Sequence, residues 1–329
     1  MSDGFGLAGV QTVARKVIAN IEQALIGKRQ QIVFALAAAL SEGHILLEDV
    51  PGVAKTMLAR ALAQSMGVSF NRVQCTPDLL PSDILGTSIF HPKTGEFVFR
   101  RGPIFCQVLL ADEINRATPR TQSALLEAMA EGRVSIDGTT YRLDPPFLVI
   151  ATQNPIEHEG TFPLPEAQLD RFLLRFSLGY PQLEEEIQLL GRLQLEHPID
   201  KIRPVISAAD LLNAQQAVRR VHVEDRVRQY IVELVHATRE HEDVRLGGSP
   251  RAGIALFRTA QAVAAMLGRG FVLPDDIKRI FHAVLGHRII LRPESRLRRV
   301  SVEDVLNEVL DAVPVPIVEP PTPKRTASP

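Results

Sequence analysis

A lysine followed by a threonine is the first pair of side chains in this sequence that could do chemistry. Lys55 and Thr56 close the run Asp-Val-Pro-Gly-Val-Ala-Lys-Thr, which begins at residue 49 and contains Pro51 and Gly52. In a phosphate-binding loop, backbone N–H groups and a helix N-terminus surround the phosphates, the lysine reaches the β and γ oxygens, and the hydroxyl ligates magnesium. This pair therefore predicts a site for ATP and Mg²⁺.

The loop departs at two positions from the strict pattern GxxxxGK[ST], since Asp49 and Ala54 stand where that pattern has glycine. We expect Ala54 to be compatible with the start of a helix, because it adds only one methyl group. Gly52 and Pro51 still supply a tight turn. Taken alone, the segment could equally be an ordinary turn before a helix, and the effect of both departures on nucleotide affinity stays open.

Two adjacent carboxylates, Asp112 and Glu113, end the apolar run of residues 108–111. Two charges at the end of a buried strand need a partner, because an uncompensated buried charge is costly. Magnesium would supply one: Asp112 can hold the ion through a water, while Glu113 can orient and polarise an attacking water. The alternative is an acidic turn after a strand.

Three further polar residues stand at the ends of predicted elements. Asn154 follows the next apolar run, which would place it at the carboxyl edge of a sheet, where ligands of α/β folds bind. An Asn before Pro is also a common turn residue. Arg171 precedes a later apolar run and Arg251 lies in the first turn of a helix opened by Ser249. A guanidinium suits a transferring phosphate, although each arginine taken singly is more commonly a surface or salt-bridged residue.

The elements that must position these side chains alternate between strand and helix. Short apolar runs predict strands at residues 44–48, 68–75, 106–111, 147–152 and 172–178. A helix is expected from about Lys55 to Met66, where Gly67 ends it. Strands separated by helical segments indicate a parallel sheet. The two cysteines, Cys75 and Cys106, lie in the predicted strands and are interpreted as buried thiols.

Two hairpins and a helical region complete the organisation. Residues 88–99 should turn at residues 92–95, and residues 133–143 should turn at Asp137-Gly138. After residue 180 the strand pattern ends and helices follow, with Ser207, Ser249 and Ser301 at their starts. The last residues carry six prolines from Pro314 on, which predicts a disordered tail. We therefore expect three regions, with the sheet domain at 1–180, a helical domain at 181–313 and the tail at 314–329.

Composition restricts the classes of partner and compartment. Lys plus Arg (37) nearly balances Asp plus Glu (38), and aromatic residues make up 5%, which disfavours a nucleic-acid groove. The longest apolar run, Ile32–Leu40, is too short to span a bilayer, and the N-terminus lacks a signal-peptide pattern, so a cytoplasmic location is expected. The closest histidine pairs are five residues apart and should point to different helix faces, so no zinc site is expected.

Together these motifs resemble those of the AAA+ ATPases and, within them, the MoxR family, over essentially residues 11–313. HILLEDVPGVAKT resembles the Walker A segment and LLADEINRA the Walker B segment. ATQNP resembles sensor 1, LPEAQLDRF the arginine-finger segment, and GGSPRA sensor 2.

The resemblance implies an α/β fold: an AAA+ P-loop domain with a five-stranded parallel sheet in the order 5-1-4-3-2 and two β-hairpin insertions, followed by an all-α lid. It also implies that Ile26 and Gly27 pack near the adenine, that Arg251 reaches the γ-phosphate in cis, and that Arg171 acts on a neighbouring subunit's nucleotide. The residues expected to contact the nucleotide are Ile26, Gly27, Pro51, Gly52, Val53, Ala54, Lys55, Thr56, Met57 and Arg251. Those expected to take part in hydrolysis are Lys55, Asp112, Glu113, Asn154, Arg171 and Arg251, with Thr56 and Asp112 as metal ligands.

The activity implied by the resemblance is ATP hydrolysis by a ring, expected to be a hexamer, with a chaperone-like role in remodelling or activating partner proteins. Proteins with von Willebrand factor A domains and metal-enzyme maturation are the clients that the family suggests. The alternative is a DNA-translocating or DNA-remodelling ATPase, since related proteins with similar hairpins move DNA and arginines cluster over residues 288–299. A non-hydrolysing scaffold is disfavoured because every catalytic position is occupied.

Overall fold

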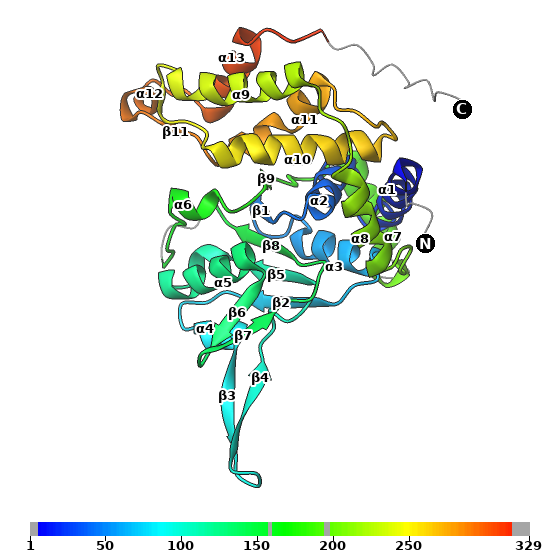
Figure 1. Ribbon diagram of the computed structural model, residues 1–329, viewed down its shortest axis with the longest axis vertical. Helices are drawn as coiled ribbons and strands as arrows, with labels where there is room; N and C mark the ends of the chain where they lie inside the picture. Colours follow the sequence, from blue (N-terminus) through cyan, green and yellow to red (C-terminus); the bar gives the residue numbers. More distant parts are fainter. Residues whose placement is uncertain (1–5, 157–159, 194–197, 318–329) are drawn as a thin grey trace, which may run out of the picture. The chain divides into compact units, whose positions relative to one another are not determined.

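The computed structural model describes residues 6–156, 160–193 and 198–317. The chain divides into two compact units (Figure 1), one of residues 12–216 and one of residues 1–11 with 217–329. No helix within these described ranges is long and apolar enough to cross a membrane.

The first unit is built on a five-stranded parallel sheet in the order β2-β5-β8-β1-β9. When the five strands of this sheet are numbered 1 to 5 in chain order and read from β9, their order is 5-1-4-3-2. The predicted strand order is therefore confirmed. The strands are β1 (Ile45–Glu48), β2 (Phe70–Gln74), β5 (Val108–Asp112), β8 (Leu148–Gln153) and β9 (Leu174–Phe176).

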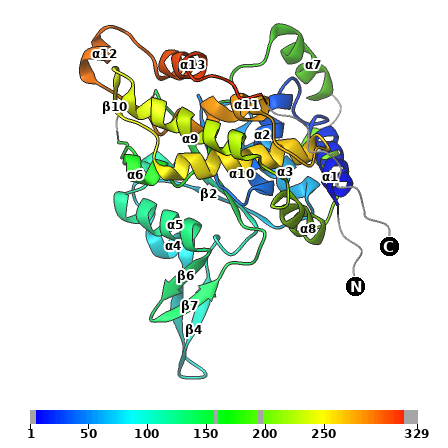
Figure 2. The same cartoon turned by 45° about the horizontal axis from the view of Figure 1, so that its top comes forward.

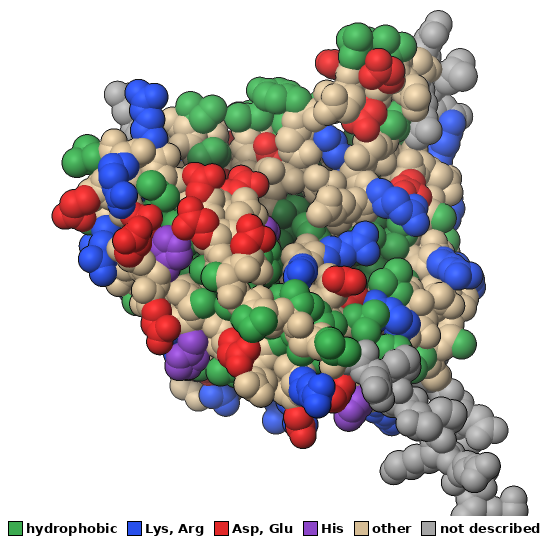
Figure 3. All heavy atoms as spheres, turned by 90° about the horizontal axis from the view of Figure 1, so that it is seen from above, with side chains coloured by type: hydrophobic (Ala, Val, Ile, Leu, Met, Phe, Trp, Pro, Cys, Tyr) green, Lys and Arg blue, Asp and Glu red, His purple; other side chains and the backbone are tan. Residues whose placement is uncertain are grey.

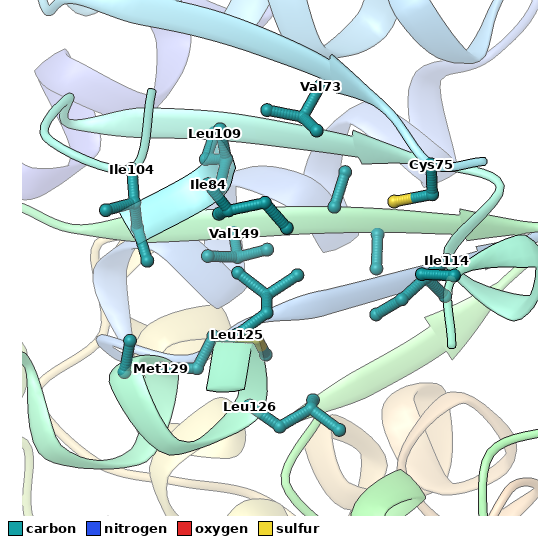
Figure 4. Packing of buried hydrophobic residues seen from close by; sticks show 14 of the residues in the cluster. Val73, Cys75, Ile84, Ile104, Leu109, Ile114, Leu125, Leu126, Met129 and Val149 are labelled. Atoms are coloured by element: carbon teal, nitrogen blue, oxygen red, sulfur yellow. The ribbon is translucent and has the colours of Figure 1, made fainter. Parts of the chain in front are cut away.

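Helices pack against this sheet, and some of their apolar side chains form a buried core with those of the strands. They are α1 (Leu7–Ile21), α2 (Arg29–Leu40), α3 (Lys55–Ser65), α4 (Pro81–Leu85), α5 (Pro119–Glu131), α6 (Glu166–Leu169), α7 (Leu183–Leu193) and α8 (Ala208–Val218), with 3₁₀ turns η1 (Ile114–Arg116) and η2 (Pro198–Lys201). α1 begins in the second unit. Leu125 and Met129 of α5 pack with Leu109 of β5 and Val149 of β8 in one buried cluster (Figure 4). Strands β5 and β8 are buried along almost their whole length, which explains why their sequences are continuous apolar runs.

The two predicted hairpins are present. One consists of β3 (Gly86–His91) and β4 (Glu96–Arg101), and the other of β6 (Arg133–Ile136) and β7 (Thr139–Arg142). Asp137 and Gly138 both have positive φ, as a tight two-residue turn requires. Ser88 Oγ donates to Asp137 Oδ2 at 2.6 Å, and the rings of Phe99 and Tyr141 stack, so the hairpins contact each other.

The second unit is mainly helical (Figure 2), with α9 (Asp225–Glu240), α10 (Pro250–Met266), α11 (Pro274–Leu285), α12 (Pro293–Leu297) and α13 (Val302–Ala312). Ser249 and Ser301 accept hydrogen bonds at the starts of α10 and α13, as predicted. One difference from the all-helical expectation is a short antiparallel pair, β10 (Val244–Leu246) with β11 (Ile290–Leu291).

The two predicted domain boundaries lie at residues 180 and 314 of the sequence. The boundary at residue 180 rests on where the strand pattern ends, whereas the first compact unit runs to residue 216 and includes α7 and most of α8. The predicted tail of residues 314–329 lies, from residue 318 on, outside the described residues. Cys75 and Cys106 are buried free thiols as predicted, but they lie just outside β2 and β5.

Candidate active site

The loop between β1 and α3 turns into the helix through a left-handed residue. Ala54 has φ 67° and ψ 24° and immediately precedes Lys55, the first residue of α3. α3 thus starts directly after Ala54, as expected, but Ala54 itself is left-handed rather than helical. A left-handed conformation is the one that glycine adopts readily, and a residue with a Cβ adopts it at a cost of about 1–2 kcal/mol. Gly52, with φ 88°, supplies a second left-handed position in the same loop.

Asp49 has a structural role that the motif pattern did not reveal. Its side chain is buried, and Oδ2 accepts the backbone N–H groups of Leu178 (2.5 Å) and Gly179 (2.9 Å). Its carbonyl oxygen accepts a hydrogen bond from Lys55 Nζ at 2.7 Å, and that of Val50 accepts another at 3.1 Å. Asp49 thus fastens the start of the phosphate-binding loop to the segment that follows β9.

Asp112 ends β5 with both carboxylate oxygens hydrogen-bonded. Thr152 Oγ1, fully buried in β8, donates to Oδ1 at 2.6 Å. Arg72 of β2 donates to Oδ2 from Nε at 3.1 Å and from Nη2 at 2.7 Å. The two neighbouring strands therefore each contribute one partner to this carboxylate.

Glu113 is held in the left-handed region, with φ 58° and ψ 50°. Its N–H donates to Thr152 Oγ1 at 2.8 Å, so one threonine hydroxyl bonds both acidic residues. The Glu113 Oε2 atom accepts hydrogen bonds from Gln74 Nε2 (2.8 Å) and Arg116 Nη1 (3.0 Å). A non-glycine residue in this conformation is typical of functional sites, where surrounding contacts enforce it.

A cavity of about 490 Å³ brings most of the predicted residues together. It is lined by Pro51, Gly52, Ala54, Lys55, Thr56, Met57, Asp112, Glu113 and Asn154 among the predicted residues, and by Arg60, Arg72, Gln74 and Ile199 among residues that sequence reasoning missed. Asn154 is buried, and its Oδ1 accepts the N–H of Ile156 at 3.1 Å. The phosphate-loop residues and the acidic pair, 56 residues apart in sequence, thus face one space.

Five predicted residues do not line this cavity. Val53 belongs to the loop, and its side chain is buried. Ile26 is half-buried, and Gly27 has φ 71° with the Glu185 carboxylate so close that a Cβ would lie 1.7 Å from Oε1. The positive φ favours glycine at position 27, whereas the Glu185 carboxylate is the flexible end of a side chain and could move aside. Arg171 is half-buried just before β9, and Arg251 is exposed in the second compact unit.

The donor set fits a nucleoside triphosphate with a divalent cation. Lys55, Arg60 and the first N–H groups of α3 can donate to phosphate oxygens. The Thr56 hydroxyl and the Asp112 carboxylate are oxygen ligands, which hard cations prefer. Within the described residues no group of three or more His, Cys, Asp or Glu side chains could hold a metal ion. A cation at this site would therefore depend on phosphate and water for its remaining ligands, as Mg²⁺ commonly does.

Comparison with known proteins agrees with this geometry. Residues 44–174 match the family described as "ATPase family associated with various cellular activities (AAA)", and residues 236–309 match the AAA lid domain. The fold and the site thus define an AAA+ ATPase. The chain is 42% identical over 322 residues to chaperone MoxR1 of Mycobacterium tuberculosis, covering 95% of this chain and 85% of that protein. It belongs to the MoxR family of AAA+ ATPases, as the motifs predicted.

Two further relatives cover nearly the whole chain. Protein YeaC of Bacillus subtilis is 51% identical over 302 residues, which is 92% of this chain and 94% of that protein. A crystal structure from Cytophaga hutchinsonii is 39% identical, with a TM-score of 0.88 over 94% of this chain and 97% of that one. The solved structure therefore shares the fold of this chain over nearly its full length.

Proposed function

We propose that this chain binds ATP with Mg²⁺ and hydrolyses it to ADP and phosphate. The observation that carries the proposal is the shared cavity, which is lined by Lys55 and Thr56 as well as by Asp112 and Glu113. Membership of the AAA family supports the reaction type. Adjacent cationic and acidic groups in one cavity suit a polyphosphate and its metal ion.

Each side chain has a distinct task in this proposal. Lys55 would neutralise phosphate charge, and Thr56 and Asp112 would hold the metal ion. Magnesium, when bound, would offset charge on the β and γ phosphates. Glu113 orients and polarises the attacking water, with its carboxylate positioned by Gln74 and Arg116. Asn154, at the cavity wall, contacts the γ-phosphate or the water.

The two remaining arginines are assigned by family resemblance. Arg251 is proposed to reach the γ-phosphate of its own subunit, and Arg171 that of a neighbour in a ring, expected to be a hexamer. Ile26 and Gly27 are proposed to lie near the adenine, and Val53 to contribute backbone to the loop. A head-to-tail ring provides for this, because the same donor surface meets the same acceptor site at every interface.

The output proposed for hydrolysis is chaperone-like remodelling of partner proteins in the cytoplasm. One close relative carries the name chaperone, which supports this class. Partners with von Willebrand factor A domains, or enzymes that need a metal inserted, are the proposed clients.

A DNA-remodelling ATPase is the second candidate, favoured by the exposed aromatic side chains of the first hairpin, Phe90 and Phe97. An MCM homologue from Methanopyrus kandleri shares the fold at 18% identity, which supports the fold alone. Against DNA, Lys plus Arg (37) nearly balances Asp plus Glu (38) over the sequence, and the face shown in Figure 3 carries charges of both signs. ATPase rates with and without single- and double-stranded DNA separate the candidates, since only a DNA motor should be stimulated.

The proposed roles are tested by separating binding from turnover. Lys55→Ala should largely abolish ATP binding, because it removes the phosphate counter-charge. Glu113→Gln should retain binding but lose turnover, because only water activation is affected. Affinity is measured with a fluorescent ATP analogue, and phosphate release gives the rate. Equal loss of affinity in the two variants would contradict the assignment.

A further inference from the structure

Arg72, which lines the cavity, forms an ion pair with the proposed metal ligand Asp112. β2 pairs in parallel with β5, with Gln74 opposite Asp112. Residues 72 and 74 lie on the same face of β2, because side chains alternate along a strand. Arg72 Nη2 also donates to Gln74 Oε1 at 2.8 Å, so the guanidinium bonds both Gln74 and the Asp112 carboxylate.

The two oxygens of Asp112 differ in how firmly their partners are held. Oδ1 accepts from Thr152, whose hydroxyl is fully buried and also accepts the Glu113 N–H. Oδ2 accepts two N–H groups of Arg72, whose side chain is 48% exposed. Arg72, which lines the cavity and is half exposed, is therefore less constrained by packing than Thr152. A cation that used Oδ2 as a ligand would share this oxygen with Arg72.

A guanidinium and a divalent cation at one carboxylate repel each other, and the surrounding protein screens this repulsion less than water does. A bound triphosphate reverses the balance, because its negative charge attracts both cations. Building on the proposed ATP–Mg²⁺ function, we infer that Arg72 competes with the divalent cation for Asp112. The metal ion then binds strongly only together with the nucleotide.

The test measures metal binding rather than turnover. Mn²⁺ serves as the probe, and free Mn²⁺ is followed by electron paramagnetic resonance with the full chain. Without nucleotide, Arg72→Gln should bind Mn²⁺ roughly five-fold more tightly than the unaltered protein, the effect of about 1 kcal/mol. With a non-hydrolysable ATP analogue the difference should shrink. Adding Asp112→Asn to Arg72→Gln should abolish the gain.

Arg60→Gln is the matched control. Arg60 lines the same cavity, and its replacement removes the same charge without touching the Asp112 carboxylate. Its effect on nucleotide-free Mn²⁺ affinity should be about two-fold or less at physiological salt, because screening weakens charges that are not in contact. Arg72→Lys keeps the charge but has a single ammonium group, so its nucleotide-free Mn²⁺ affinity should lie between those of the unaltered protein and Arg72→Gln. It replaces Arg72→Gln if that variant is unstable.

The outcomes separate this inference from the function on which it rests. If Arg60→Gln and Arg72→Gln raise the nucleotide-free Mn²⁺ affinity equally, the loss of one positive charge explains the effect. That result would overturn competition at Asp112. No rise in Arg72→Gln, while nucleotide-dependent Mn²⁺ binding still requires Asp112, would make Arg72 a structural ion pair and leave the proposed function standing. Loss of any Asp112 dependence even with nucleotide would overturn both.

Discussion

Among single residues, Ala54 carries backbone strain at the centre of the phosphate-binding loop. Its left-handed conformation is one that glycine adopts without strain, so glycine here would stabilise the folded state. The larger backbone entropy of glycine in the unfolded chain partly offsets this stabilisation. Ala54→Gly should therefore raise the free energy of unfolding by about 0.5 kcal/mol, and Ala54→Val should lower it by about 1–2 kcal/mol. Thermal unfolding measures both, at roughly 2–4 °C per kcal/mol for a unit of this size. A valine variant as stable as the unaltered chain would refute the left-handed assignment.

His44, just before β1, is a buried neutral histidine that ties β8 to α5. Its Nδ1 accepts the N–H of Val149 at 3.0 Å, so Nε2 carries the proton and donates to Met129 O at 3.0 Å. Burial lowers the pKa of His44 from 6.5 to about 4. The folded protein thus resists protonation that the unfolded chain accepts.

Stability should therefore depend on pH through His44. The unfolded chain binds the proton between pH 6.5 and 4, so the stability present above pH 6.5 is lost as the pH falls, by up to about 3 kcal/mol. Denaturant unfolding between pH 7 and pH 4 measures the slope. His44→Gln, whose amide can accept and donate but does not titrate, should show a shallower slope. Identical slopes would mean that carboxylates alone cause the acid sensitivity.

For the elements, the connection between the phosphate-binding loop and the end of β9 depends on Asp49. Replacing Asp49 with the glycine of the strict motif should destabilise the protein by about 1–3 kcal/mol, because two backbone N–H groups lose their acceptor. Asp49→Asn retains an acceptor oxygen and should cost less. Melting temperatures rank the three proteins. If Asp49→Gly melts at or above the unaltered chain, the contact to Leu178 and Gly179 does not support the fold.

The strands could be predicted from apolar runs, but their ends could not. β2 was expected from residue 68 and begins at Phe70, where its partner β5 begins at Val108. Strand ends follow from pairing with a neighbour, which local composition does not encode. The same limit applies to Cys106, which belongs to the apolar run but precedes the paired segment.

Sequence motifs predict some residues of the site. They do not predict the residues that reach the site only through the pairing of neighbouring strands. Lys55, Asp112 and Asn154 lie at the ends of helices or strands, and these ends can be located in the sequence without the strand order of the sheet. Thr152 and Arg72 act on Asp112 only because β8 and β2 flank β5. One signal was available: residues 72 and 74 alternate onto one face of a predicted strand and both are polar.

On the scale of the whole assembly, the proposed ring makes Arg171 part of a neighbour's site. Arg171→Ala should nearly silence hydrolysis while leaving ATP binding largely intact, because arginine fingers contribute roughly 10³ to 10⁵ in rate. Arg171→Ala subunits keep an intact phosphate-binding loop, and Lys55→Ala subunits keep an intact finger. Mixing the two inactive proteins should therefore restore activity at some interfaces. Subunit exchange without recovery at any ratio would place Arg171 in cis or in a structural role.

The stacked pair of Phe99 and Tyr141, with ring centroids 4.1 Å apart, gives the two hairpins an optical signature. The chain has no tryptophan and three tyrosines, so its near-ultraviolet spectrum is dominated by few chromophores. Tyr180 is exposed and Tyr230 is buried, which leaves Tyr141 as the tyrosine that reports on hairpin contact. Circular dichroism near 280 nm, compared with that of Tyr141→Phe, would therefore follow any separation of the hairpins during the nucleotide cycle without an added label.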